Sequence, residues 1–459
     1  MKINIIKAIF IIIATAYSIC ILNLNAQNVK ECKTMTLKEC MKFAVENSAK
    51  IRIQQTENAD ARVNRKDAVL QAFTPNINAN TQVYSNFGRT IDPETNTYVS
   101  TTSFNNSYAV SAGITLFNGF AAINNMKISK TAKAMGLSKE QQIKDEICLE
   151  TIQAYYNAVY YSALTKILEE QAETIRKSLR LVEEQEKLGQ KGYADVVQAK
   201  AELADKEFEV TSAQNSLKNA YITLKEVMFW PVSEELSIDT SAAEDDINIL
   251  YEETDTRNIV QTALLTNPGI FLAKSAMENA RLSLMTAKWK LAPSLDLYGG
   301  WSTSFYTYPG QTGYTPTPFG RQFKDNGGEF IQLTLSIPIF DRLSRQSEIS
   351  RKKNAYARST AQYEQKIHEV ESEVLRAIQD RDGAEAAFYS AERRSEVQEE
   401  AYRLNIRKFE LGLISTIEYQ TASDNYLKAK AERLNALLQY HLKNKVVTYY
   451  NGVSYLEQE

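Results

Sequence analysis

The chain of 459 residues repeats itself once, and this duplication limits the folds that it can adopt. The same features recur in the same order in both halves, at a shift of 218 to 223 residues. The matched pairs are Pro75 and Pro293, Ile114–Lys130 and Ile337–Lys353, and Gly189 and Gly412. Self-similarity at a fixed spacing indicates one structural unit used more than once. We therefore expect two structural repeats, residues 27–230 and 256–459.

Two segments lie outside the repeats. Residues 1–26 contain Lys2 and Lys7, then an apolar run, then Ala26, which is the pattern of a secretory signal peptide. A membrane anchor is the alternative, although the run is short for the roughly 20 residues that a crossing helix needs. Residues 231–255 contain nine acidic residues and no basic ones. This acidic connector is more typical of a solvated link than of a docking surface.

Three cysteines remain after the signal peptide is removed. An exported protein meets a compartment in which Cys32 and Cys40 can form a disulfide. The spacing alone does not decide the pairing, so two unpaired thiols are an equal alternative. Cys148 falls in a helical stretch, where we expect it to be packed.

Four segments alternate between apolar and polar residues, as strands with one apolar and one polar face do. In the last of them, Ile331, Leu333 and Leu335 share one face, whereas Gln332 and Thr334 share the other. Each segment has about the length that a tilted strand needs to cross a bilayer, and aromatic residues gather at the strand ends as in outer-membrane barrels. The expected strands are residues 76–87, 104–117, 294–306 and 328–339.

These strands can be explained in two ways, as a soluble sheet or as part of a membrane barrel. In a soluble sheet a helix would cover the apolar face, but the helical stretches carry apolar seams too narrow for that. Four strands cannot close a membrane barrel, because the smallest use eight. Open strand edges in lipid cost several kcal/mol for each unpaired backbone group. Several copies must therefore share one barrel, and three copies supply twelve strands.

Long helices make up most of the remaining sequence. The expected helices are Leu37–Ala72, Ala121–Leu188 and Ala194–Met228, then two that end near Leu291 and Leu411, and Thr416–Tyr450. A helix of about 70 residues is roughly 100 Å long, twice the length of the shorter helices that follow each glycine break. One apolar seam has heptad spacing and contains Val196, Ala199, Leu203 and Lys206. Lys206 is its one polar residue. Such rods favour a long tube over a compact bundle.

Taken in this order, the features resemble the TolC-like outer-membrane efflux family over essentially the whole mature chain. The features that carry the resemblance are the duplication, Asn267-Pro268 before a helix, the strand pairs after Pro75 and Pro293, and the hairpin tips Leu188–Ala199 and Leu411–Ala422. Ser48 departs from the pattern, because a proline is common there. The resemblance implies a mostly α chain of duplicated helix–strand–strand–helix–helix units. In a homotrimer these form a 12-stranded β-barrel, four strands per chain, continued by a long α-helical periplasmic barrel.

The resemblance also implies a function and a location. The protein would be a passive exit duct of a tripartite efflux or secretion system, set in outer-membrane lipid and extending into the periplasm. A periplasmic adaptor protein and an inner-membrane transporter would open it at its periplasmic tip. The alternatives are a periplasmic coiled-coil protein without a pore, which ignores the strand alternation, and a stand-alone porin, which leaves the long helices unexplained. The net charge of −3 gives no basic field for nucleic acid.

Candidate site residues follow the two hairpin turns. In the family, carboxylates after the second turn line the periplasmic mouth; that position is Glu418 here, and the second carboxylate is replaced by Thr421. Asp195 is the matching residue of the first repeat. Either acid can instead stabilise a helix N-terminus by about 0.3–1 kcal/mol; both roles stay open for Glu418, and capping is favoured for Asp195. The candidates for adaptor contact are Gly189, Gly192, Gly412 and Ser415.

We expect no enzymatic activity, cofactor or metal site. His368 and His441 are the only histidines, and both fall in charged helical stretches. Surface or packing roles are more common than catalysis in that setting. No nucleophile elbow, phosphate-binding loop or zinc spacing stands out in the sequence.

Overall fold

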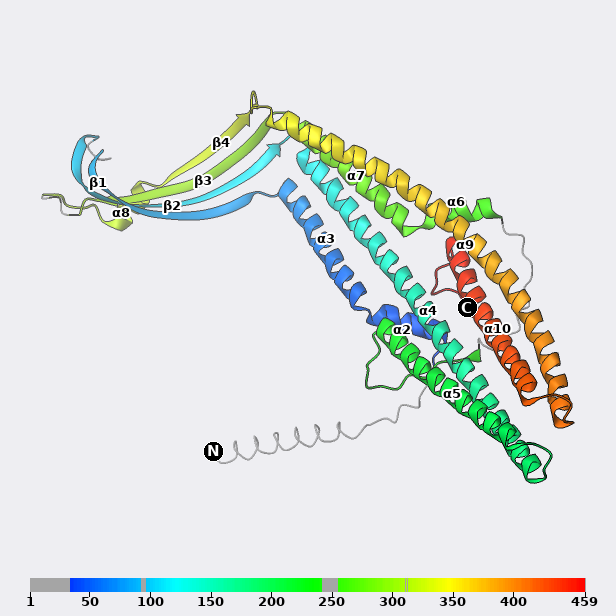
Figure 1. Cartoon of the computed structure of the whole chain (residues 1–459). Coiled ribbons are helices and arrows are strands. Elements are labelled where there is room, and N and C mark those ends of the chain that lie inside the picture. The colour runs from blue at the N-terminus through cyan, green and yellow to red at the C-terminus, as the bar shows by residue number, and fades with distance from the viewer. Residues whose placement is uncertain (1–33, 92–95, 242–254, 310, 312, 459) are drawn as a thin grey trace, which may run out of the picture.

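The computed structural model describes residues 34–91, 96–241, 255–309, 311 and 313–458. The expected signal peptide, residues 1–26, and most of the acidic connector lie outside this range. The described chain is elongated, with a sheet at one end and long helices leading away from it (Figure 1).

The sheet contains four antiparallel strands in the order β1-β2-β3-β4. They are β1 (Asn76–Ile91), β2 (Tyr98–Phe117), β3 (Ser294–Thr307) and β4 (Gly328–Ser336). The first hairpin is longer than expected, since β1 and β2 pair without a break as far as Ile91 and Tyr98. β4 is shorter than expected and ends at Ser336. Pro338 follows closely and has no N–H to give to a ladder.

The strand register places the apolar residues of all four strands on the same face of the sheet. Apolar residues meet on one face in the pairs Ile77 with Ala112, Val110 with Trp301, and Leu297 with Leu333. Much of this face is open in the single chain, with Ile331 86% and Ile77 67% exposed. The short helix α8 (Phe319–Asp325) packs on the face at the end far from the other helices, where the Phe323 ring lies 5.6 Å from that of Trp301. The described residues therefore leave a large apolar surface of the sheet uncovered.

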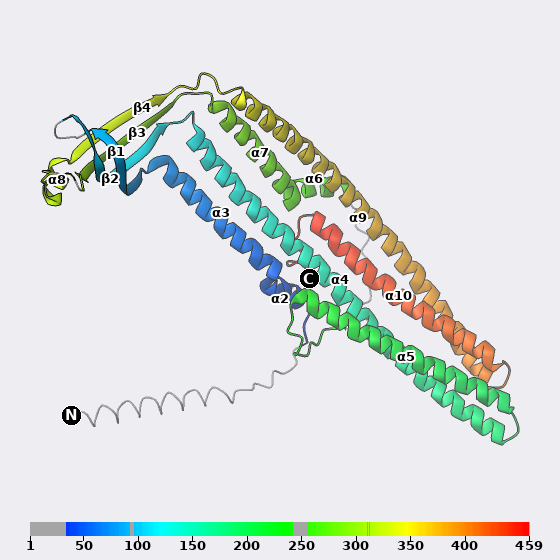
Figure 2. The same cartoon turned by 60° about the vertical axis from the view of Figure 1, so that its left-hand side comes forward.

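Eight longer helices are described. They are α2 (Leu37–Asn47), α3 (Ala49–Phe73), α4 (Ala121–Lys187), α5 (Tyr193–Met228), α6 (Thr256–Thr266), α7 (Pro268–Trp289), α9 (Ser344–Glu410) and α10 (Thr416–Tyr450). Helices α3, α4, α7 and α9 lie side by side and continue the sheet in the order of its strands (Figures 1 and 2). Farther from the sheet, α5 pairs with α4 and α10 pairs with α9. The 67 residues of α4 or α9 span roughly 100 Å.

The expected single helix Leu37–Ala72 is wrong, because the chain breaks at Ser48. The backbone of Ser48 has φ −60° and ψ 128°, close to the φ −63° and ψ 121° of Asn267 between α6 and α7. The Ser48 hydroxyl makes no capping hydrogen bond in the described residues, so the break does not depend on it. The first repeat therefore makes the same break as the second, without the proline that follows Asn267.

The largest apolar core lies at mid-length, where α2, α4 and α5 meet the end of α10. Its fully buried residues include Met41, Ile152 and Leu224. Cys40 and Cys148 are free thiols in this core, and burial raises the pKa of each to about 12. Cys148 is thus packed as expected. Cys32 lies outside the described residues, so its pairing stays a prediction.

Candidate functional site

The two hairpin tips have the same backbone geometry. Gly189 after α4 has φ +72°, and Gly412 after α9 has φ +71°. In each turn the next residue donates its N–H to a carbonyl five residues back: Gln190 to Gln185, and Leu413 to Lys408, both at 2.8 Å. This motif satisfies carbonyls at a helix end and needs a residue that tolerates positive φ. The glycines are therefore required by the turns.

The two candidate carboxylates begin the helices that follow these turns. Glu418 Oε2 accepts hydrogen bonds from the backbone N of Ser415 at 2.8 Å and from its Oγ at 3.0 Å. These bonds favour the charged form and lower the pKa of Glu418. Asp195 Oδ2 accepts from the backbone N of Gly192 at 3.0 Å. Glu418 completes a capping box, because Ser415 Oγ in turn accepts from the backbone N of Glu418 at 3.2 Å. Gly192 has no side chain, so Asp195 makes only the acid's half of such a box.

The remaining site predictions concern exposure at the tips. Glu418 and Thr421 are both exposed, and the Thr421 hydroxyl donates to the carbonyl of Ile417 at 2.9 Å. Gly189, Gly192, Gly412 and Ser415 are all exposed. A capping carboxylate on an exposed helix end can also face a lumen, so the lumenal role of Glu418 stays a prediction.

The two hairpins pack against each other just above the tips. The ring of Phe409 stacks on Tyr419 at 4.7 Å, and Tyr402 stacks on Tyr426 at 5.3 Å. Val196 of the first hairpin belongs to the same cluster. The contact between the two hairpins thus includes aromatic residues of α9 and α10 and the apolar seam of α5.

A charged group lies at the upper end of this cluster, and sequence reasoning missed it. Lys206, the polar residue of the heptad seam, lies 2.7 Å from Asp424 Oδ1 and 3.0 Å from Glu209 Oε2. Glu202, one turn before it, is 3% exposed, and its Oε1 has no hydrogen-bond partner in the described part of the chain. Burial, and then the charge of Asp424, raise the pKa of Glu202 to about 7. The sequence does contain one sign of this group: Glu202 lies next to Leu203 of the apolar heptad seam.

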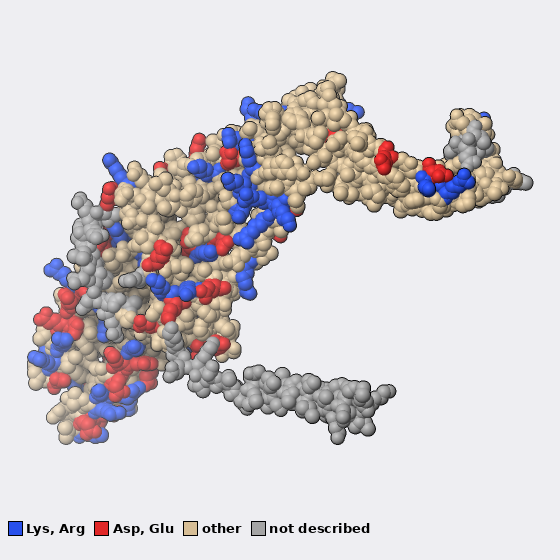
Figure 3. Space-filling model, turned by 180° about the vertical axis from the view of Figure 1, so that it is seen from behind, with Lys and Arg blue, Asp and Glu red and all other residues tan. Residues whose placement is uncertain are grey.

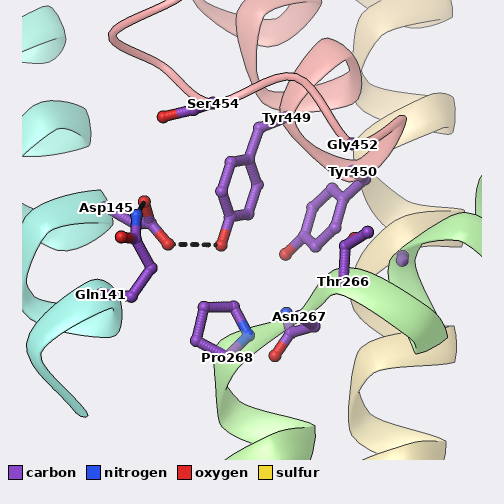
Figure 4. Close-up of a pocket in the computed structure, with 10 residues that line it drawn as sticks. Gln141, Asp145, Thr266, Asn267, Pro268, Tyr449, Tyr450, Gly452 and Ser454 are labelled. Atoms are coloured by element: carbon purple, nitrogen blue, oxygen red, sulfur yellow. Dashed lines mark hydrogen bonds between the residues drawn. The ribbon is translucent and has the colours of Figure 1, made fainter. Parts of the chain in front are cut away.

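A second polar cluster joins the two repeats at mid-length (Figure 4). Asp145 on α4 accepts hydrogen bonds from the Tyr449 hydroxyl at 2.8 Å and from Gln141 Nε2 at 2.9 Å. It borders a cavity of about 120 Å³ that also touches Asn267 and Pro268 at the α6–α7 break. Burial raises the pKa of Asp145. This cluster fixes α4 against the end of α10.

Side chains of the metal-ligating types do not gather in the described part of the chain. No three His, Cys, Asp or Glu side chains in that part of the chain are placed to hold a metal ion. His368 Nδ1 lies 3.1 Å from Glu371 Oε2 on an exposed helix face, and His441 stacks with Tyr156. In the described part of the chain, no helix has both the length and the hydropathy of a membrane-crossing helix.

Comparison with known proteins identifies the family. The sequence model of the outer membrane efflux protein family matches residues 45–228 and 259–448. The chain belongs to this family. The two matched stretches fall inside the two expected repeats. Outer membrane protein TolC of Escherichia coli K12 is 21% identical over 351 residues, which is 73% of this chain and 68% of TolC.

Solved structures of other outer membrane channels have the same fold. The CmeC outer membrane channel of Campylobacter jejuni superposes with a TM-score of 0.74 at 17% identity, covering 91% of this chain and 85% of CmeC. The open state of the MtrE outer membrane channel of Neisseria gonorrhoeae gives 0.72 at 15% identity, covering 90% and 88%. The expected fold class is confirmed, and so is the location. The protein is an efflux channel of the outer membrane.

Proposed function

We propose that three copies of this chain form a passive exit duct of a tripartite efflux or secretion system. The observation that carries the proposal is the uncovered apolar face of the sheet together with its two open edges. β1 and β4 are the first and last strands of the described sheet, so each has one edge without a partner there. Pairing β4 of one copy with β1 of the next closes a ring and satisfies those backbone groups.

Three copies suit a barrel continued by a helical tube. Twelve strands are enough to close a membrane barrel, because the smallest such barrels have eight strands. Because α3, α4, α7 and α9 continue the strands in order, a ring of strands also arranges the long helices in a ring. A coiled-coil protein without a pore would leave Ile331, Leu333 and Leu335 in water, where they are 61–86% exposed. A stand-alone porin would need no such helices.

The tips are the proposed contact with a periplasmic adaptor and, through it, an inner-membrane transporter. Large apolar side chains surround the turn glycines: Leu188, Leu411 and Leu413 are 70–73% exposed. Exposed apolar residues gathered at one end of a molecule are typical of a protein-binding surface. The capped turns present Gly189, Gly192, Gly412 and Ser415 to that partner.

Glu418 is the proposed lumenal constriction, and the duct performs no catalysis. Three Glu418 carboxylates around a threefold axis form an acidic ring, which favours cations. The hydrogen bonds from Ser415 keep each carboxylate charged. Thr421 adds no second charge, so the ring is single. Asp195, bound to its own turn, serves as a cap.

Single-channel recording in planar bilayers tests the proposed duct. The purified protein should conduct, with a preference for cations that Glu418→Gln reduces. Glu396→Gln, an exposed acid along α9, is the matched control and should leave selectivity unchanged. Tyr419→Ala should increase the open fraction, because it removes a large side chain from the apolar cluster that the two hairpins share. Membranes that never conduct, even with this variant, would overturn the proposal.

A further inference from the structure

A basic groove lies between α3 and α4 on the sheet side of the molecule. Its volume is about 370 Å³, and its lining residues are Arg62, Arg65, Lys66, Val69, Leu70 and Lys133. Asp60 and Asp67, the nearest acids of α3 in sequence, do not line it. In the described residues none of the four cations makes an ion pair. Figure 3 shows Lys and Arg gathered on the helices near the sheet.

Two positions of this groove are apolar and buried in the second repeat. At the 218-residue shift that relates Pro75 to Pro293, Lys66 corresponds to Leu284 and Val69 to Ala287. Leu284 is 9% exposed and Ala287 is 2% exposed, so this helix is packed against its neighbours. The groove residues of α3 are all exposed. These two positions are therefore open in the first repeat, where α3 packs on α4, and covered in the second, where α7 lies between α4 and α9.

The groove starts at the depth of lipid headgroups, and its cations lie farther from the membrane. α3 ends at Phe73, shortly before β1 begins at Asn76. Leu70 and Arg62 thus lie roughly 5 and 17 Å along the helix from its membrane end. The headgroup layer is roughly 5–8 Å thick on each side of the hydrocarbon. Long Arg and Lys side chains extend toward that layer while their stems stay on apolar surface.

A second copy of the chain does not supply the missing negative charge. In the proposed trimer the other edge helix, α9, would flank α3, and this step alone rests on the proposed function. The sheet-side part of α9 is itself basic, with Arg351, Lys352, Lys353 and Arg358. Cations on both sides of a subunit boundary repel unless an anion lies between them.

We propose that this groove binds the anionic headgroup of a phospholipid from the periplasmic leaflet of the outer membrane. The four cations bind the phosphate and any further negative group, and Val69 and Leu70 contact the start of the acyl chains. Bound lipid neutralises the groove and fixes the depth of the barrel in the membrane. Lipid is favoured over a free anion because the groove combines apolar and basic side chains.

Native mass spectrometry of the full-length protein in detergent tests this. Phosphatidylglycerol is the anionic probe, and phosphatidylcholine is the zwitterionic one. The variant carries Arg62→Gln, Arg65→Gln, Lys66→Gln and Lys133→Gln. The control carries Lys166→Gln, Lys177→Gln, Arg180→Gln and Lys218→Gln, four exposed positions with the same charge change and far from the membrane. Each basic side chain near an anionic surface strengthens binding roughly fivefold.

The groove variant should bind phosphatidylglycerol at least about tenfold more weakly than the wild type and the control. Its phosphatidylcholine binding and its conductance should not change, which separates this proposal from that of the duct. If the fourfold variant does not fold, Arg65→Gln with Lys66→Gln should give a smaller loss in the same direction. Equal binding by groove and control variants would overturn the proposal, and so would displacement of the lipid by millimolar inorganic phosphate.

Discussion

Replacing Glu202 should make the packing of the tips nearly independent of pH. The charged and titratable groups around it are Asp205 and Lys206 on its own helix and Asp424 and Tyr419 on α10. Lys206 is already paired with Asp424, so the Glu202 charge has no ion-pair partner of its own. Burial therefore favours the protonated acid when the hairpins are packed.

The sign and size follow from the pKa of Glu202. It rises from an ordinary value of 4.5 to about 7, which at 1.4 kcal/mol for each pKa unit is about 3 kcal/mol per chain. Because the pKa is raised in the packed state, protonated Glu202 stabilises the packed tips fully below pH 4.5. This stabilisation is lost as the pH rises through 7. Packed tips should open more readily at pH 8.5 than at pH 5.5. Glu202→Gln has no charge to bury and should remove that difference.

Hydrogen exchange of the amides in Val196–Leu203 measures the opening. The measured quantity is the protection factor of these amides in Glu202→Gln divided by that in the wild type. Because pH changes the intrinsic exchange rate equally in both proteins, this ratio is free of that effect. Between pH 5.5 and 8.5 this ratio should rise by about 30-fold, because part of the full effect is already lost between pH 4.5 and 5.5. Glu226→Gln, an exposed acid on the same helix, should leave the ratio constant. A ratio for Glu202→Gln that stays the same at every pH would refute the reasoning.

Other substitutions test the turns and the mid-length cluster through thermal unfolding. Gly412→Ala should destabilise the second tip by about 1–2 kcal/mol, because φ is +71° there. Gly383→Ala, in open space inside α9, should instead stabilise by about 1 kcal/mol, and equal effects at the two glycines would contradict the turn geometry. Tyr449→Phe should cost about 1–3 kcal/mol, because it leaves the buried Asp145 short of a donor. Adding Asp145→Asn should recover part of this loss, and strictly additive effects would show that the two groups do not interact.

Features set by local chemistry could be predicted from the sequence. Strand alternation, with a proline just before each first strand, placed the starts of β1 and β3 at Asn76 and Ser294. A glycine after each long helix placed the two tips, because few other residues accept positive φ. The break at Ser48 escaped prediction because its counterpart is marked by Asn267-Pro268, whereas serine is also common inside helices.

The polar clusters could not be predicted, because their partners come from the other repeat. Asp145 and its donor Tyr449 are 304 residues apart in sequence. Lys206 meets Asp424 across the two hairpins, and only that packing shows that Glu202 is buried. Periodicity reports which face of a helix is apolar. It does not report which charged residue of a distant helix reaches that face.

Spin labels along β4 test most directly whether the alternating strands lie between lipid and water. A nitroxide is placed in turn at residues 331 to 335 of the protein reconstituted in liposomes. Labels at Ile331, Leu333 and Leu335 should collide mainly with oxygen, which is concentrated in lipid, and labels at Gln332 and Thr334 with a water-soluble nickel complex. Access that alternates with a period of two is the predicted result. Equal access of the nickel complex to all five positions would contradict a barrel in the membrane.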